Sequence, residues 1–263
     1  MLTPAQRAEF DARGFVRFHA AFDAEDAARM RRVVWAELDR RYGITEHDPA
    51  TWTIGMPSHM STSKRHRAFA PIGGTVFQEA VDDLLGAGAW TTPAHWGQVM
   101  ITFPERGAVW TLPSRLWHVD WSYANAPEPL FGVKLFAFFG DVEPRAGGTL
   151  VVTGSHRIVE RFVGATPTEQ RDDYRTCRLR FMRHDPWFGA LGRADDSDPG
   201  RTARFMDHEH DIDGVAVRVV ELTGRAGDIV LTHPWLLHHA APNTGAFPRM
   251  MRGRNIDVRR DGR

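Results

Sequence analysis

The sequence predicts a mainly β protein whose β-core is flanked by helices. Two observations indicate this class. From about residue 95 the chain contains many short runs of β-branched and aromatic residues separated by Gly, Pro and Asp, which is typical of a sandwich or barrel of short strands. Before that point, apolar residues recur at helical spacing instead. The 263 residues contain no internal repeat or low-complexity linker, so we expect one domain over 1–263, with residues 1–94 mostly helical and residues 95–257 forming the β-core.

The first elements are a short helix and a strand. Thr3 is a suitable N-cap and Gly14 a suitable C-terminal residue for a helix between them. Residues 14–22 then alternate between core-facing and solvent-facing side chains, as a strand does.

Residues 23–43 form the clearest helix of the sequence. Asp23 can cap its start, acidic residues occupy its first turn, and arginines precede Gly43 at its end. A second, shorter helix is expected over residues 75–86. Between the two, residues 44–67 are polar and rich in turn formers. A loop of this length in a compact domain is often functional, so we expect it to shape a pocket.

The β-core is expected to consist of short strands in a regular series. They cover residues 95–103, 131–142, 148–154, 216–222, 228–233 and 249–258. Residues 164–213 interrupt the series and are charged and turn-rich in part, as in "GRADDSDPGRTAR". We expect an irregular insertion there that also helps to shape the pocket.

Charge and cysteine usage exclude several classes of function. Lys and Arg number 33, as do Asp and Glu, so the formal net charge is zero and no global field attracts nucleic acid or an anionic membrane. The single Cys177 cannot form an internal disulfide. We find no signal-peptide core and no apolar run of transmembrane length. We therefore expect a cytoplasmic protein with a small-molecule substrate, and the sequence leaves its oligomeric state open.

A histidine and an aspartate two residues apart, in "LPSRLWHVDWSY", are candidate metal ligands. In an extended segment, His118 and Asp120 point to the same side. They supply two of the three ligands of the 2-His-1-carboxylate triad, which leaves open positions on a non-haem Fe(II). The neighbouring Trp117 and Trp121 are suited either to a core or to a dry pocket wall.

The third ligand must be a histidine from elsewhere, and residues 224–256 offer His233, His238 and His239. A one-residue shift turns a strand side chain to the opposite face, so only one of the last two can face a metal. Eleven residues after His238 comes Arg249, beyond a Pro/Asn/Gly turn that can return the chain beside it. An arginine grips a carboxylate by parallel hydrogen bonds, which suits the far end of 2-oxoglutarate.

These residues also lie in blocks that resemble the phytanoyl-CoA dioxygenase family of Fe(II)/2-oxoglutarate-dependent oxygenases. The blocks are "HVD" at 118–120, "RAGGTLVVTGSH" at 145–156, "GDIVLTHPWLLH" at 227–238 and "PNTGAFPR" at 242–249. Their order and spacing are similar, and the resemblance covers nearly the whole chain. It implies a double-stranded β-helix (jelly-roll, cupin-like) core that uses Fe(II), 2-oxoglutarate and O2.

By this resemblance, His118, Asp120 and His238 match the metal ligands, and Arg249 matches the arginine that binds 2-oxoglutarate. One position departs from the pattern. Many members have a hydroxyl residue two after the distal histidine, where this chain has Ala240.

Another group is then expected to assist the arginine. The first candidate is Gln98, on the strand before the H-x-D pair, and Thr102 and Thr149 are weaker ones.

The resemblance implies an oxidation, most simply the hydroxylation of a small-molecule metabolite with release of succinate and CO2. Related halogenases have a small residue in place of the carboxylate ligand, so Asp120 favours hydroxylation, with desaturation or ring chemistry as open alternatives. Two other classes remain open: a non-catalytic metal-binding or sensor module on the same fold, and a Zn or Mn Lewis-acid hydrolase or isomerase of cupin type. The substrate itself does not follow from the fold.

Overall fold

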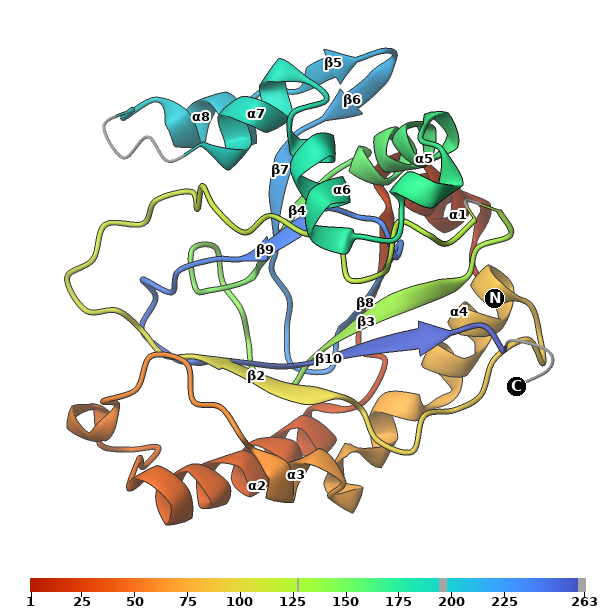
Figure 1. Ribbon diagram of the computed structural model, residues 1–263. Helices are drawn as coiled ribbons and strands as arrows, with labels where there is room; N and C mark the ends of the chain where they lie inside the picture. Colours follow the sequence, from red (N-terminus) through yellow and green to blue (C-terminus); the bar gives the residue numbers. More distant parts are fainter. Residues whose placement is uncertain (127, 194–197, 260–263) are drawn as a thin grey trace.

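Two antiparallel sheets face each other at the centre of the molecule, shown as a ribbon in Figure 1. The structure is a computed structural model that describes residues 1–126, 128–193 and 198–259. Within those ranges the larger sheet has five strands in the order β1-β8-β3-β10-β2. Their bounds are β1 Phe15–Phe18, β8 Ile229–Thr232, β3 Gly132–Phe138, β10 Arg249–Asp257 and β2 Gln98–Thr102.

The smaller sheet has the order β7-β4-β9 in the described part of the chain. Its strands are β7 Val219–Leu222, β4 Thr149–Val152 and β9 His238–Ala240. A single bridge between His118 and His238 adds the segment around residue 118 to the free edge of β9. Two facing antiparallel sheets of this order confirm the mainly β, jelly-roll core that the sequence predicts. Strands β5 His210–Ile212 and β6 Val215–Val217 form a separate hairpin.

The space between the sheets is filled by alternate side chains of each strand, because successive residues of a strand point to opposite faces. On β3, Phe136 and Phe138 point inward and Val133 and Leu135 point outward into a different cluster. The inner cluster contains Phe15, Phe136, Phe138, Val142, Val151, Leu222, Val230, Leu236 and Met251. Membership of this cluster identifies the inward face of each strand.

Helices of the N-terminal part contribute to the core cluster on the outer face of the larger sheet, and those within residues 24–64 lie below that sheet in Figure 1. They are α1 Pro4–Arg13, α2 Ala24–Tyr42, α3 Ser61–Lys64 and α4 Thr75–Leu85, with 3-10 turns at Pro49–Thr51 and Arg67–Gly73. The predicted caps are confirmed: Thr3 and Asp23 accept backbone N–H groups, and Gly43 ends α2 at φ 64°. None of the helices in the described residues combines the length and apolar character needed to cross a membrane.

Residues 44–67 are fastened to α2 and the larger sheet. The indole of Trp52 stacks on Trp35 of α2 at 6.2 Å between ring centroids and contacts Phe103 at 5.3 Å. The buried carboxylate of Glu37 accepts the N–H groups of Thr62 and Ser63 at 2.9 and 2.7 Å. The segment is therefore anchored by its own side chains, and its role in shaping a pocket stays a prediction.

The insertion over residues 164–213 consists mostly of short helices where described and ends in strand β5, so the prediction of an irregular segment was wrong. It follows α5 Ser155–Ala165 and contains α6 Tyr174–Met182, α7 Pro186–Gly192 and α8 Arg201–Met206, which lie over the smaller sheet (Figure 1). Asp173 and Asp185 cap two of these helices. Their apolar residues pack into a core cluster with the smaller sheet. Residues 194–197, within the turn-rich stretch quoted above, lie outside the described residues.

Candidate metal and co-substrate site

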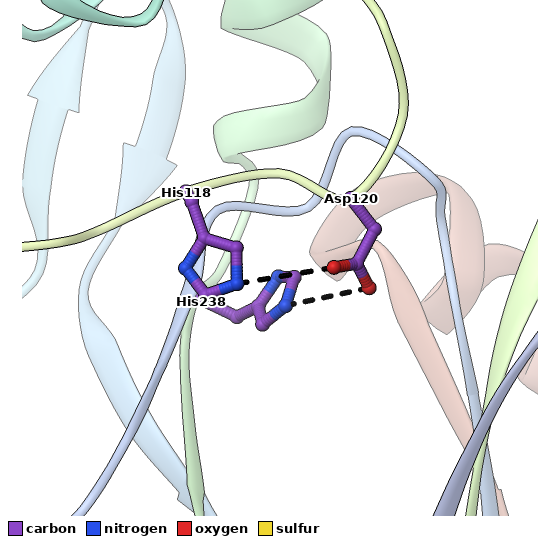
Figure 2. A group of neighbouring side chains, drawn as sticks. All are labelled: His118, Asp120 and His238. Carbon is purple, nitrogen blue, oxygen red and sulfur yellow. Dashed lines mark ion pairs between the residues drawn. The ribbon is translucent and has the colours of Figure 1, made fainter. Parts of the chain in front are cut away.

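The three predicted metal ligands converge in the structure. His118 and Asp120 come from one extended segment, and His238 begins β9 beside it (Figure 2). The backbone N–H of His118 donates to the His238 carbonyl at 3.1 Å, and that of His238 donates back to the His118 carbonyl at 2.9 Å. The candidate ligand atoms of the three residues all lie within 4.8 Å of one another. The sequence separation of over a hundred residues is therefore closed by a pair of backbone hydrogen bonds.

Both imidazoles present Nε2 to the carboxylate. The Asp120 carboxylate lies 3.8 Å from His118 Nε2 through Oδ1 and 3.6 Å from His238 Nε2 through Oδ2. In each histidine Nδ1 donates to a backbone carbonyl at 2.9 Å, that of Leu116 or that of Leu236. A carbonyl oxygen only accepts, so the proton is on Nδ1 and the Nε2 lone pair is free to bind a metal.

Burial and charge set the ionisation of the ligands. Burial lowers the pKa of His238 to about 3, so its imidazole is neutral at physiological pH, as a metal ligand must be. Burial raises the pKa of the Asp120 carboxyl, but the electrostatic interaction with the His238 ring and the charge and hydrogen bond of the Lys134 ammonium outweigh it and hold this pKa below its usual range. Two imidazoles that present Nε2 and one carboxylate, gathered on one side of the site, match the ligand set that binds a divalent iron. These residues fit the metal that the sequence predicts.

The tryptophans next to the candidate ligands point away from the metal site. Trp117, Val119 and Trp121 point away from the site into the core cluster behind the smaller sheet. The Trp117 indole N–H donates to the Pro113 carbonyl at 3.0 Å, and the Trp121 indole N–H donates to Asp257 at 2.7 Å. Both rings anchor the ligand segment and face away from the metal ligands, and Trp121 also lines a pocket with Phe131 and Asp257.

Arg249 starts β10 and is buried without a partner for much of its guanidinium. Its exposed fraction is 3%, and its Nε and Nη1 have no hydrogen-bond partner among the described residues. Burial lowers its pKa to about 10, so it still carries its charge at physiological pH. A buried cation with unused donors is costly unless an anion completes it. This position therefore fits the carboxylate of a bound co-substrate.

A family profile covers most of the chain. The profile of the phytanoyl-CoA dioxygenase family (PhyH) matches residues 10–251. The chain belongs to this family. As a phytanoyl-CoA dioxygenase family member, it is an Fe(II)- and 2-oxoglutarate-dependent oxygenase, of a family that acts on small-molecule substrates.

Solved structures of low identity share the fold of this family member. EctD from S. alaskensis, in its apoform, has 16% identity and a TM-score of 0.53, covering 98% of this chain and 77% of its own. EvdO2 from Micromonospora carbonacea var. aurantiaca, complexed with 2-oxoglutarate, has 14% identity and a TM-score of 0.51, covering 98% and 92%. The non-heme alpha ketoglutarate dependent carbocyclase SnoK from nogalamycin biosynthesis has 17% identity and a TM-score of 0.52, covering 98% and 84%. No curated protein sequence matches the chain.

The other histidines and the nearby arginine considered from the sequence do not join the candidate site. His239 points away from His238, and its ring contacts that of Trp117 at 5.5 Å between centroids. His233 is buried, and its Nε2 lies 3.1 Å from the Glu160 carboxylate. Arg252 leaves the opposite face of β10 from Arg249 and donates to the Gly97 carbonyl at 2.7 Å. Of the three candidate histidines, only His238 joins His118 and Asp120.

The structure does not bring Gln98 to Arg249. In the β2–β10 register Gln98 pairs with Gly253, whereas Thr102 pairs with Arg249. Four residues of strand span roughly 13 Å, and Gln98 is exposed. Sequence spacing identified the strand but not the register, so the two weaker candidates, Thr102 and Thr149, are the better placed ones.

Lys134 is a site residue that sequence reasoning missed. It lies on the inward face of β3, two residues before Phe136, and its ammonium bonds the Asp120 carboxylate. The signal in the sequence is a single lysine in the otherwise apolar run "FGVKLFAFF". In the period-2 pattern of a strand it shares a face with aromatic core residues, which makes it a buried charge in need of a partner.

Proposed function

We propose that this family member is a hydroxylase that binds Fe(II) through His118, Asp120 and His238 and binds 2-oxoglutarate through Arg249. The observation that supports this proposal most is the convergence of two Nδ1-protonated histidines and a carboxylate from distant segments on one side of the site. The intact carboxylate at residue 120 favours hydroxylation over chemistry that needs that coordination position free.

The protein's part in the reaction is to bind, orient and shield. The bound metal and co-substrate supply the oxidation, in which 2-oxoglutarate and O2 yield succinate and CO2 while a small-molecule substrate is hydroxylated. Backbone carbonyls fix both imidazole rings by accepting from Nδ1. Arg249 holds the remote carboxylate of the co-substrate in a buried position. The His118 side chain is 41% exposed, against 10% for His238, so we place substrate entry on the His118 side.

We further propose that residues 1–263 work as one domain in the cytoplasm, without nucleic-acid or membrane partners. The shared cluster of α2, α4 and the larger sheet supports one domain, because the N-terminal helices have no separate core among the described residues. The balanced charge and the buried thiol of Cys177 are consistent with the location and the small-molecule partner.

The first experiment is spectroscopic and needs no substrate. Anaerobic protein receives Fe(II) and then 2-oxoglutarate, and the visible charge-transfer band of the chelate is recorded. We expect a band in the wild type, a much weaker one in Arg249→Leu at the same co-substrate concentration, and its restoration at higher concentration. Iron bound without any band overturns the proposal and favours a metal-binding module or a Lewis-acid enzyme.

The ligand assignment has a matched pair of adjacent histidines for its test. His238→Ala is expected to lose metal binding, because it removes one of three ligands, whereas His239→Ala is expected to retain it, because that ring faces the core. Mn(II) binding followed by electron paramagnetic resonance distinguishes the two. Equal loss in both variants, or loss in His239→Ala alone, contradicts the assignment. Asp120→Ala is expected to abolish succinate release once a substrate is found.

A further inference from the structure

Three polar side chains, those of Arg249, Thr149 and Thr102, point into the same end of the space between the two sheets. Arg249 and Met251 share a face of β10, and Thr149 and Val151 share a face of β4. Met251 and Val151 belong to the same inner cluster. Thr149 and Arg249 therefore point into one space from opposite sheets.

Thr102 joins them from β2. It pairs directly with Arg249, so its side chain is on the same face. The start of β4 also lies against this residue, since a Cβ atom on Gly147 would lie 3.5 Å from the Thr102 Cβ. The Asn243 amide donates to the Thr102 carbonyl at 2.8 Å and closes the same end.

The polar atoms of these three residues are buried and unsatisfied. The hydroxyls of Thr102 and Thr149 and the Nε and Nη1 of Arg249 have no hydrogen-bond partner among the described residues. Thr149 is 2% exposed and Thr102 is 7% exposed. Buried donors are nearly always paired, so unpaired donors gathered in one place indicate an absent acceptor. A carboxylate, with two oxygens and about four lone-pair sites, can accept from all of them.

Register fixes how far this acceptor lies from the metal ligands. Val151 pairs with His238, and Thr149 pairs with Ala240, two residues further along both strands. Two residues of strand cover roughly 6.6 Å, which suits a short dicarboxylate whose other end is held beside His238. The Ala240 side chain has no donor to offer, and Thr149, which has a hydroxyl, is the residue paired with it on β4.

We infer that Thr149, with Thr102 on the other flank, donates hydrogen bonds to the remote carboxylate of 2-oxoglutarate and so replaces the donor that Ala240 lacks. This inference rests on the proposed function. It makes these two threonines positioning residues for the co-substrate, with selectivity for a dicarboxylate as their measurable effect.

The test measures binding without turnover. Calorimetry on the Mn(II)-loaded protein gives Kd for 2-oxoglutarate and for 2-oxopentanoate, which has the same chain length but lacks the remote carboxylate. Thr149→Val removes the hydroxyl and keeps the shape, and we expect Kd for 2-oxoglutarate to rise about tenfold, the size of one hydrogen bond to a charged group, while Kd for 2-oxopentanoate stays unchanged. Thr102→Val is expected to act in the same direction. Thr244→Val, which removes the hydroxyl that donates to the Arg145 carbonyl, is the control and should leave both Kd values unchanged.

A second-site change separates a binding role from a structural one. Ala240→Ser in the Thr149→Val background returns a hydroxyl from the paired position and is expected to restore most of the affinity for 2-oxoglutarate. The melting temperature of ligand-free Thr149→Val should equal or exceed that of the wild type, because the lost hydroxyl has no partner there.

The outcomes distinguish the two proposals. If the wild type binds no 2-oxoglutarate, the proposed function fails. If the wild type binds it and Arg249→Leu does not, but the threonine variants match the wild type, only this inference fails. Equal weakening of both ligands by Thr149→Val also overturns it, because a contact with the remote carboxylate cannot affect a ligand that lacks one.

Discussion

Each candidate ligand histidine donates from Nδ1 to the carbonyl two residues before it, Leu116 for His118 and Leu236 for His238. The tautomer that leaves Nε2 free is thus selected by local backbone and needs no side-chain partner. This differs from sites in which a carboxylate orients the ring. At the residue scale, each imidazole is oriented for a metal by the backbone two residues before it.

Lys134 acts against metal binding at the same scale. Its ammonium bonds the Asp120 carboxylate and helps to lower the pKa of His238. A positive charge in contact with a ligand repels a dication. We expect Lys134→Met to tighten Mn(II) binding about tenfold, because the repulsion between an ammonium and a dication in a partly buried site raises Kd by roughly that factor or more. Lys64→Met, on α3 outside the site, changes the net charge equally and serves as the control. Weaker binding by Lys134→Met instead would assign Lys134 the role of orienting Asp120.

At the element scale, strand β10 gives two arginines opposite roles. Arg249 points between the sheets and has unused donors, whereas Arg252 points outward, donates to the Ser63 and Gly97 carbonyls at 2.6 and 2.7 Å, and lies over the Phe69 ring at 3.6 Å. Residues an odd number of positions apart in a strand point to opposite faces, and Arg249 and Arg252 are three positions apart. The satisfied arginine fixes the strand, and the unsatisfied one is left for a ligand.

Gly97 controls how closely β2 approaches β10. It has φ +80°, and a Cβ atom there would overlap the Gly253 carbonyl oxygen. Gly88 has φ +75° with nothing near its missing side chain. Gly88→Ala is expected to cost about 1–2 kcal/mol of unfolding free energy, the cost of a left-handed residue with a side chain, and Gly97→Ala clearly more. Urea unfolding compares the two variants. Equal losses would mean that the β2–β10 contact tolerates displacement.

His156 makes the contact between α5 and α1 sensitive to acid. It is buried, its Nε2 donates to the Asp11 carbonyl at 3.1 Å, and its ring lies 4.8 Å from that of His233, with Arg157 next to it. Burial lowers its pKa to about 3 in the folded protein, against about 6.5 when unfolded. The unfolded state therefore takes up the proton first, and stability is lost as pH falls below about 6.5, by at most about 1.4 kcal/mol per pH unit.

The pH dependence is checked by melting temperatures between pH 7.5 and 5.0. We expect His156→Gln to lose less stability than the wild type over this interval, because the variant has no proton to gain at this position. The comparison of slopes cancels other groups that titrate in both proteins. Parallel slopes contradict the assignment of this acid sensitivity to His156.

At the scale of the whole molecule, the sequence predicted the elements better than their packing. The helices of the N-terminal part follow from caps and periodicity at Thr3 and Asp23, which act locally. The i, i+2 spacing predicted that His118 and Asp120 share one side, and the resemblance to the family selected His238 as the third candidate ligand; the three lie together in the structure. The position of Gln98 was not, because cross-strand register depends on pairing that only the folded sheet defines.

The helices over the smaller sheet show the same limit. Their sequence is charged and interrupted by turn formers, so no long period is visible. Only the tertiary context shows that Phe181, Trp187 and Phe205 all pack into one cluster with the sheet. Short capped helices of this kind are stabilised by packing rather than by propensity.

Metal binding is expected to stabilise the whole molecule, since its ligands come from two segments far apart in the chain. A free Mn(II) concentration of 100 times Kd adds about 2.7 kcal/mol to the free energy of unfolding, which corresponds to a rise in Tm of roughly 5–10 °C for a chain of this size. Differential scanning calorimetry measures the rise. Asp120→Ala is expected to lose it and His239→Ala to keep it. An unchanged rise in Asp120→Ala would place the ion elsewhere.

The single bridge between His118 and His238 has a consequence for local motion. An edge strand held by one bridge frays easily, because few amides are protected there. An ion bound by His118, Asp120 and His238 would hold this segment against β9 through side chains as well as through the backbone. The amide of His118, which donates to the His238 carbonyl, would then exchange with solvent more slowly when metal is bound. Slower exchange of the His118 amide would therefore indicate that the metal site is occupied.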